Sequence, residues 1–381
     1  MKTRRRHTQR LPVATARSLA SAALLATLAV GCAAEFDPAS ELTGLRVLAV
    51  KKDVPYARPG ESVDLAMLWH DAEPGRPPPQ VAWVALCENP PADLFEACFT
   101  QLPDLPPEEL ATRISVPEPG ATTVNDRFSF VTSTDLISSR PPPEANATPY
   151  GLSYVFFAAC AGQLDVDMAA QVPFVCYEES DGIDGFSEGD TRRDSRDFVV
   201  GYSAVFAYDT FRNQNPVVSG VQFGDATLWP DSPPDVAAAA PPGAVLASAR
   251  DLCIGAGCEV IQPETDSEPC LDVLTLDACV GGECDSVDVR PLVDASSAEL
   301  DDAASARGGE ILGEQMWVNY YASAGEMSEE VRLLNDAVAG FSTDTASEYE
   351  PPEEARVSYL WAVAHDNRGG TEWARVRVCT R

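Results

Sequence analysis

The chain has 381 residues, of which 59 are Asp or Glu and 27 are Lys or Arg, so its formal net charge is −32. Residues 1–31 contain six of the basic residues and no acidic one, which leaves 21 basic and 59 acidic residues, a net charge of −38, in the remaining chain. Such a surface repels nucleic acids and argues against nucleic-acid binding. A hydrophobic fraction of 45% argues against a disordered acidic chain, and the length after residue 31 is typical of two domains.

The first 31 residues have the pattern of a signal peptide. A basic segment, residues 1–18, precedes the apolar run Leu19–Val30, whose 12 residues are too few to span a bilayer as a helix. The run ends in Leu28-Ala29-Val30-Gly31-Cys32, which resembles the lipobox of bacterial lipoproteins. The resemblance implies cleavage before Cys32, acylation of Cys32 and anchoring in a membrane, whereas the alternative is an ordinary secretory signal. Because Ala33 follows the cysteine, the resemblance also implies sorting to the outer membrane.

The cysteine content agrees with export. Apart from Cys32, the chain has ten cysteines, an even number that predicts a disulfide framework in an oxidising compartment. We expect the pairs Cys87–Cys98 and Cys160–Cys176, and we expect Cys379 to join the cysteines of the second half. These candidates are Cys87, Cys98, Cys160, Cys176, Cys253, Cys258, Cys270, Cys279, Cys284 and Cys379.

Two glycine-rich segments in the second half share the form C-x4-C. They are Cys253–Cys258 and Cys279–Cys284. Four thiolates at this spacing can bind zinc, but export favours disulfides, formed either within each segment or between the segments. We therefore expect no metal at these cysteines.

After a tether at residues 32–41, short β-rich runs alternate with clusters of Pro, Gly and Asp. Many short strands separated by proline-rich turns predict antiparallel β-sandwiches. The clearest runs are Leu45–Val50, Ser62–Trp69, Val81–Leu86, Tyr154–Ala159 and Phe198–Ala207.

Three landmarks occur twice in the same order and predict a tandem duplication. They are a Pro-Gly turn before a strand (Pro59-Gly60 and Pro242-Gly243), an aromatic strand ending in small residues (Tyr154–Gly162 and Trp317–Gly325), and a tyrosine-bearing strand ending in Asp (Tyr202–Asp209 and Tyr359–Asp366). Polar turn residues at Asn213–Pro216 mark the expected boundary. We therefore expect two modules, residues 42–212 and 213–381.

This pattern resembles bacterial immunoglobulin-like modules, including the polycystic-kidney-disease type. The resemblance implies two sandwiches in which Tyr202 and Tyr359 occupy the tyrosine corner. Ser328–Gly340 has an N-cap residue, acids in its first turn, helical apolar spacing and a final glycine, and Asp294–Gly308 is similar. The expected fold is mainly β: two tandem immunoglobulin-like antiparallel β-sandwiches with long loops and short helical insertions in the second.

One loop is a candidate metal site. Four acids, Asp181, Asp184, Glu188 and Asp190, lie at short spacings among glycines, as calcium prefers. The spacing does not follow the EF-hand pattern, and a solvated acidic loop is the alternative. No cofactor is expected apart from this possible structural calcium ion.

The sequence offers little support for catalysis. His70 and His365 are each followed by Asp, but adjacent residues on a strand point to opposite faces and do not normally pair. The familiar hydrolase, zinc-protease and phosphate-binding motifs do not occur. We therefore expect no enzymatic activity.

The expected function is a non-catalytic binding, adhesion or structural role for a lipoprotein of the cell envelope. The membrane is contacted through the N-terminal lipid, and an envelope protein or polysaccharide is the expected partner. The alternative is a carbohydrate-binding module or carbohydrate-active enzyme. It would use an aromatic platform of Trp83, Trp317, Trp361 and Trp373, although aromatic residues in strands more often pack in cores.

Overall fold

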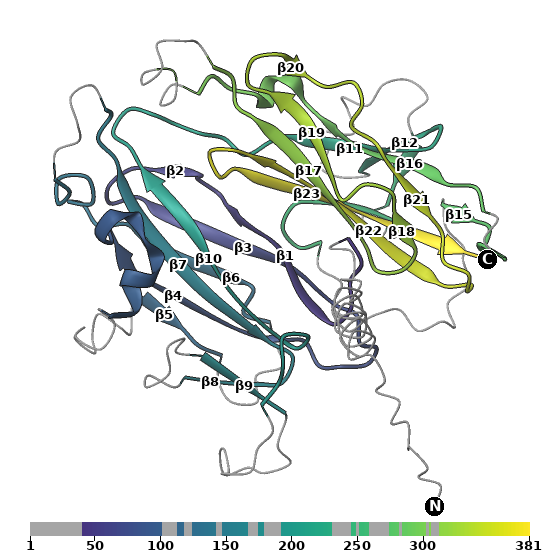
Figure 1. Ribbon diagram of the computed structural model, residues 1–381, viewed down its shortest axis with the longest axis horizontal. Helices are drawn as coiled ribbons and strands as arrows, with labels where there is room; N and C mark the ends of the chain where they lie inside the picture. The colour runs from purple at the N-terminus through teal and green to yellow at the C-terminus, as the bar shows by residue number, and fades with distance from the viewer. Residues whose placement is uncertain are drawn as a thin grey trace, which may run out of the picture. The chain divides into compact units, whose positions relative to one another are not determined.

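Strands dominate the part of the chain that the structure describes, and they form four main sheets (Figure 1). The structure is a computed structural model. It describes residues 40–100, 113–117, 124–141, 147–166, 174–178, 192–230, 245–248, 251–258, 274–281, 284–301, 305 and 312–381. Each main sheet takes all its strands from one side of Asn213. The expected mainly β fold with tandem antiparallel sandwiches is confirmed.

The first sandwich has a three-stranded and a five-stranded sheet. The order of the first is β1 (Leu45–Lys52), β3 (Ser62–Asp71) and β6 (Arg127–Val131). The order of the second is β2 (Tyr56–Ala57), β10 (Phe198–Ala207), β7 (Gly151–Cys160), β4 (Gln80–Glu88) and β5 (Ile114–Ser115). Alternate residues of β3, among them Leu65, Met67 and Trp69, face the core because successive side chains of a strand point to opposite faces.

Strand β7 is buried along all ten of its residues, since both faces of its sheet are covered. The inner face packs in the sandwich core. The outer face packs against the hairpin of β8 (Gln163–Val166) and β9 (Phe174–Tyr177) and against the 3₁₀ turn η2 (Phe95–Thr100). A shorter 3₁₀ turn, η1 (Pro91–Asp93), precedes η2.

The second sandwich has larger sheets. One has the order β13 (Val245–Ala247), β12 (Ala226–Pro230), β11 (Val218–Phe223), β16 (Val287–Val293), β21 (Ser347–Glu350) and β18 (Glu326–Met327). The other has the order β14 (Leu252–Ile254), β23 (Thr371–Thr380), β22 (Val357–Asp366), β17 (Met316–Ala322), β19 (Val331–Asp336) and β20 (Gly340–Phe341), with β15 (Thr275–Leu276) also paired to β23.

The two sandwiches share their strand pairing and register. In the first sandwich, β1 pairs with β3 and has a bulge after Val47, which lies opposite Trp69. In the second sandwich, β11 pairs with β16 and has a bulge after Val218, which lies opposite Val293. The ten-residue last strands β10 and β23 match position for position, since each ends in a parallel pairing with a two-residue strand, β2 or β15. Strands of the two sandwiches therefore correspond in pairs. The equivalent pairs are β1 and β11, β2 and β15, β3 and β16, β4 and β17, β6 and β21, β7 and β22, and β10 and β23.

This correspondence corrects the landmarks drawn from the sequence. The landmarks matched β7 with β17 and β10 with β22, and both matches are wrong by one strand. By pairing, Ser153-Tyr154-Val155 in β7 corresponds to Ser358-Tyr359-Leu360 in β22. The error arose because strands β7, β17 and β22 carry a similar pattern of aromatic and small residues.

The tyrosine-corner expectation is wrong for Tyr202. Its position corresponds to Arg375 of the last strand, and its ring is 45% exposed and stacks on Phe95 with 4.6 Å between ring centroids. Tyr154 is the residue equivalent to Tyr359, and its hydroxyl donates to the carbonyl of Asp93 over 2.8 Å.

The helix expected at Ser328–Gly340 is wrong. Val331–Asp336 forms strand β19, which pairs with β17, and a turn leads from it to β20. The Ser328 hydroxyl accepts from the backbone N–H of Glu348 on β21, so it serves a neighbouring strand and caps no helix. Gly340 has a φ of 85° in the hairpin turn, where glycine is favoured as it is after a helix.

The second expected helix, Asp294–Gly308, begins as a single 3₁₀ turn. The Asp294 carboxylate accepts from the N–H of Ser296 and caps η4 (Ala295–Ser297). Leu300 then forms a β-bridge with Gly313, which an α-helix at that position would exclude. Ser305 is helical, and its N–H donates to the carbonyl of Asp301 over 2.8 Å, so a helix does form later in the predicted range. Residues 302–304 and 306–308 lie outside the described residues.

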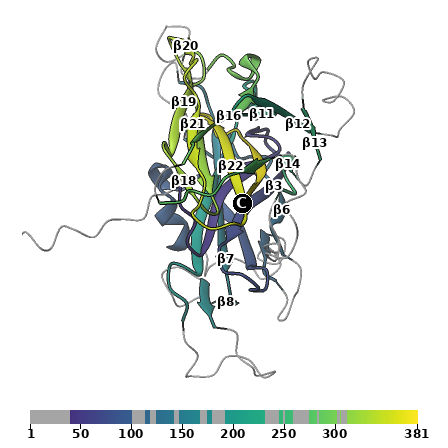
Figure 2. The ribbon, with the colours of Figure 1, turned by 90° about the vertical axis from the view of Figure 1, so that its right-hand side faces the viewer.

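The outer faces of two sheets, one from each sandwich, enclose a separate apolar cluster. Residues of β1 and β3, such as Leu48 and Leu68, pack there against Trp361 and Trp373 of β22 and β23. These strands lie beside one another in both ribbon views (Figures 1 and 2). Residues 39–381 accordingly form one compact unit.

The chain touches the second sandwich before it enters the first. The N–H of Ala322 donates to the carbonyl of Ser40 over 3.0 Å, and Glu41 forms a parallel bridge with Ala322. Strand β1 of the first sandwich begins four residues later, at Leu45. The start of the described chain is therefore fixed to β17.

Candidate functional site

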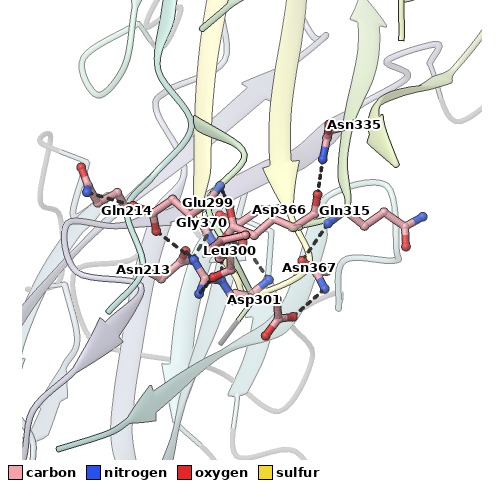
Figure 3. A network of polar contacts seen from close by, with 12 residues as sticks. Asn213, Gln214, Glu299, Leu300, Asp301, Gln315, Asn335, Asp366, Asn367 and Gly370 are labelled. Atoms are coloured by element: carbon pink, nitrogen blue, oxygen red, sulfur yellow. Dashed lines mark hydrogen bonds and ion pairs between the residues drawn. The ribbon is translucent and has the colours of Figure 1, made fainter. Parts of the chain in front are cut away.

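A buried polar network joins the segment that links the sandwiches to the hairpin between β22 and β23 (Figure 3). We call the set Asn213, Glu299, Glu314, Asp366 and Arg368 the polar junction. The Asp366 carboxylate closes the hairpin by accepting from the N–H groups of Arg368 (2.7 Å) and Gly370 (2.8 Å). A Cβ at Gly370 would lie 2.1 Å from the Asp366 carboxylate, so only glycine fits this turn.

Arg368 is the centre of the polar junction and is 5% exposed. Its Nε donates to Glu314, and its Nη2 donates to Asn213 Oδ1 (2.6 Å) and to Glu299 Oε2 (2.8 Å). Its Nη1 donates to the carbonyl of Leu300 over 3.2 Å. The guanidinium is thus bonded through all three nitrogens, as a buried cation requires.

Asn213 connects the two charged groups of the hairpin. Its Nδ2 donates to both carboxylate oxygens of Asp366, over 3.1 and 3.3 Å, while its Oδ1 accepts from Arg368. Asn213 is 4% exposed, although the sequence suggested an open turn. The linking segment is therefore part of the packed structure.

Burial shapes the acid–base properties of the polar junction. Glu314 is fully buried, and this burial raises the pKa of its carboxyl group to about 7, with the charge of Asp366 adding to the effect and Arg368 opposing it. Its oxygens are bonded to Arg368 and to the N–H of Glu299. These carboxylates are occupied by structural partners, so the arrangement serves to hold two segments together.

The polar junction continues into the first sandwich. Asn215 accepts from the N–H of Thr371 (2.9 Å) and donates to the carbonyl of Lys52 (2.7 Å). The Lys52 Nζ donates to the carbonyl of Ala204 on β10 over 2.7 Å. Burial lowers the pKa of Lys52 to about 8, and Asp366 opposes that shift.

A groove of about 470 Å³ lies beside the polar junction. Strands β1 and β10 form its walls, through residues such as Val47, Val50 and Ser203, and the hairpin residues Asp366–Thr371 complete the lining. The groove lies on the open side of the first sandwich, between β1 at the edge of the three-stranded sheet and the part of β10 that does not pair with β2.

Neither His-Asp pair forms a dyad, as the sequence indicated. The ring of His365 stacks on Trp317, while Asp366 bonds within the polar junction. The ring of His70 packs on Trp361. Burial lowers the pKa of both imidazoles to about 4, so each is neutral near pH 7.

The cysteines form four disulfides among the described residues. Cys87–Cys98 and Cys160–Cys176 are the two pairs expected in the first half. Cys253–Cys258 and Cys279–Cys284 each close their own C-x4-C loop. Cys379 is also disulfide-bonded, and Cys270 lies outside the described residues.

These disulfides leave the zinc alternative without its four thiolates. Glu350 lies near one pair, with Oε1 3.0 Å from the sulfur of Cys284 and 3.4 Å from that of Cys279. The potential ligand atoms of these three residues lie close enough together to bind one metal ion. The two sulfurs form a disulfide, however, and a metal would need them as reduced thiolates.

The four tryptophans named for the carbohydrate-binding alternative do not form an aromatic platform. Trp83, Trp361 and Trp373 are at most 1% exposed, the first in the core of its sandwich and the other two in the cluster between the sandwiches. Only Trp317 of the four is partly exposed. Asp181, Asp184, Glu188, Asp190 and the lipobox residue Cys32 lie outside the described residues.

A scan against protein-family models finds no match, and no curated protein is significantly similar to the chain. The described residues contain no helix long and apolar enough to cross a membrane.

The sequence did not reveal the polar junction. The sequence predicts only a turn at Asn213–Pro216, and it gives no signal at Glu314, Lys52 or Arg368. A charged residue in a hairpin turn is usually solvated, so the sequence carries no signal that Arg368 is buried.

Proposed function

We propose that the protein is an outer-membrane lipoprotein, anchored through Cys32, with a non-catalytic binding or structural role in the cell envelope. In this proposal, residues 42–212 and 213–381 are two immunoglobulin-like modules that act as one unit. The lipobox supports the anchor, and the packing between the modules supports the structural role.

The observation that carries the role is the attachment of the linking segment to both sandwiches. Asn213 is bonded to Arg368 of the second sandwich, and Asn215 is bonded to Lys52 of the first. A packed apolar cluster adds to these bonds. A linker fixed in this way holds the two modules in one orientation, which suits a protein that presents surfaces to partners.

Intact mass tests the anchor. The chain isolated from membranes should begin at Cys32 and carry the added mass of acyl groups, and the Cys32→Ser variant should lose that mass and leave the membrane fraction. Reduction should add about 2 Da for each disulfide, which counts the bridges in the same experiment. A Cys32→Ser variant that stays in the membrane fraction would contradict lipid anchoring.

Chemical cross-linking in intact cells tests the role. The lipidated chain should be recovered with a defined envelope protein or polysaccharide, and excess soluble Cys32→Ser chain should compete for that partner. Recovery of the chain alone, under conditions that cross-link other envelope complexes, would count against a binding role.

A further inference from the structure

Strand β10 has a free edge in the first sandwich. The backbone N–H and C=O groups of its odd-numbered residues point toward β7. The bond from the N–H of Ala161 to the carbonyl of Asp197 sets this alternation. Its even-numbered residues face the other way, where Tyr208 donates to Ala57 of β2 and the carbonyl of Ala204 accepts from Lys52. The backbone groups of Val200 and Tyr202 on this edge have no hydrogen-bond partner within the described ranges.

The second sandwich covers the equivalent edge with its own chain. Trp373, Arg375 and Arg377 of β23 correspond to Val200, Tyr202 and Ala204 of β10. There the N–H of Arg377 donates to the carbonyl of Asp251 (2.8 Å), and the N–H of Gly255 donates to the carbonyl of Trp373 (2.9 Å). Strand β14 is thus an added strand, antiparallel to β23.

Strand β14 also fills the open side of its sandwich. Leu252 is fully buried and Ile254 is partly buried, and both pack in the core of the second sandwich. Between them, Cys253 faces away from that core and forms the disulfide with Cys258. In the second sandwich, the strand added at this edge therefore places two apolar side chains, two residues apart, in the core.

In the first sandwich the corresponding space is the groove. Val47, Val50 and Phe157 line it beside the edge of β10, as β11 lies beside β14 in the second sandwich. Val200 and Tyr202 on the edge are 46% and 45% exposed. Unpaired backbone groups flanked by exposed apolar side chains form a template for pairing with another strand.

We propose that the free edge of β10 binds an extended segment of another polypeptide. The segment runs antiparallel to β10 and places apolar side chains, two residues apart, into the groove, as Leu252 and Ile254 do in the second sandwich. The proposal rests on the binding role above and names the class of partner. A second copy is a poor occupant, because each mature chain carries a net charge of −38 (21 basic and 59 acidic residues).

Hydrogen exchange on the Cys32→Ser chain tests the edge itself. The amides of Val200 and Tyr202 should exchange fast, while those of Val199, Gly201 and Ser203, which bond to β7, exchange slowly. The equivalent amides of Arg375 and Arg377 should be slow as well. Slow exchange at Val200 and Tyr202 in the free monomer, or slowing that grows with protein concentration, would overturn the proposal.

A peptide with the sequence of residues 250–257, with Cys253 replaced by Ser, is the probe for binding. At a peptide concentration that leaves about a tenth of the protein unbound, hydrogen exchange at the amides of Val200 and Tyr202 should slow about tenfold. A peptide with Asn in place of Leu252 and Ile254 should have no such effect. No slowing at millimolar concentrations of the first peptide would overturn the proposal.

Two variants separate backbone pairing from side-chain contact. Tyr202→Pro removes an N–H that faces the groove and leaves the bonds to β7, so it should abolish peptide binding, whereas Tyr202→Ala should keep part of it. Val200→Lys should abolish binding, and Val338→Lys, the same change at a residue that is 82% exposed in the turn between β19 and β20, should not. Equal binding by Tyr202→Pro and Tyr202→Ala would overturn strand addition.

The same variants distinguish this inference from the proposed function. A cellular partner that cross-links equally to the wild-type chain and to Tyr202→Pro would retain the binding role and overturn the β10 edge as its site. If the wild-type chain cross-links to no partner in cells, the binding role itself is overturned, even if the peptide binds to β10.

Discussion

Arg368 donates from Nη2 to Oδ1 of Asn213 over 2.6 Å, so the hairpin that closes the second sandwich is bonded to the segment that joins the two sandwiches. This contact lies between residues 155 positions apart, and both side chains are buried. The linker is thereby part of the core structure of the unit.

Replacing Arg368 tests the energetic weight of the polar junction. Arg368→Met would leave the carboxylates of Glu314 and Glu299 without their shared cation, and Glu314 is fully buried. We expect the free energy of unfolding to fall by about 3–5 kcal/mol, as when one partner of a buried ion pair is removed.

Urea unfolding at pH 7 measures this effect. Arg356→Met, at an exposed arginine, is the matched control and should change the free energy of unfolding by less than about 0.5 kcal/mol. Equal stability of the two variants would show that the polar junction does not hold the structure together.

His70 links stability to pH. Its unfolded-state pKa is near 6.5, and burial lowers the folded-state pKa to about 4. As the pH falls from 6.5 to 4, the unfolded chain takes up the proton first, so stability is lost across this range, by about 3 kcal/mol in total for this one group.

His70→Phe should remove that dependence. The Nδ1 of His70 is buried without a hydrogen-bond partner, so Phe should retain the packing on Trp361 and match the wild-type stability at pH 7. The difference between variant and wild type should then grow in favour of the variant as the pH falls to 4.5. A difference that stays constant between pH 7 and pH 4.5 would contradict a neutral, buried His70.

Trp361 tests the apolar cluster between the sandwiches. Trp361→Ala would open a cavity there, because the side chain is 1% exposed and packs with residues of both sandwiches. We expect a loss of about 3–5 kcal/mol in the free energy of unfolding. Trp317→Ala, at a partly exposed ring, should cost clearly less, and an equal loss from both would argue against a tight cluster.

The disulfides should differ in their effects. Replacing Cys160 and Cys176 by Ala opens a bridge between residues 16 positions apart, and replacing Cys253 and Cys258 opens one between residues 5 positions apart. Loop-closure entropy predicts losses of about 3 and about 2 kcal/mol, respectively. Thermal unfolding of the two double variants measures the difference, and a larger loss from the shorter loop would point to a role for β14 beyond its own bridge.

The strands could be predicted from the sequence because local alternation specifies them. Val63, Leu65 and Met67 are separated by Asp64 and Ala66, and they lie in the core as that alternation requires. The helix predicted at Ser328–Gly340 failed for the opposite reason. Its apolar spacing suits either structure, and pairing with β17, a tertiary contact, determines the outcome.

The candidate site lay beyond prediction because it depends on long-range contacts. Arg368 meets Glu314, Glu299 and Asn213 across 54, 69 and 155 positions of the sequence. The free edge of β10 is likewise visible only by comparison with β23, whose partner β14 comes from a segment with no counterpart in the first half.

The bond between Ser40 and Ala322 has a mechanical consequence. The chain is attached to β17 of the second sandwich before it enters β1 of the first, so tension applied at residue 40 acts on the attachment to the second sandwich before it reaches the first. Such a pull would first peel the short bridge at Glu41, and only then load β1 along its pairing with β3. The bridge would give way first and shield the first sandwich from weak forces.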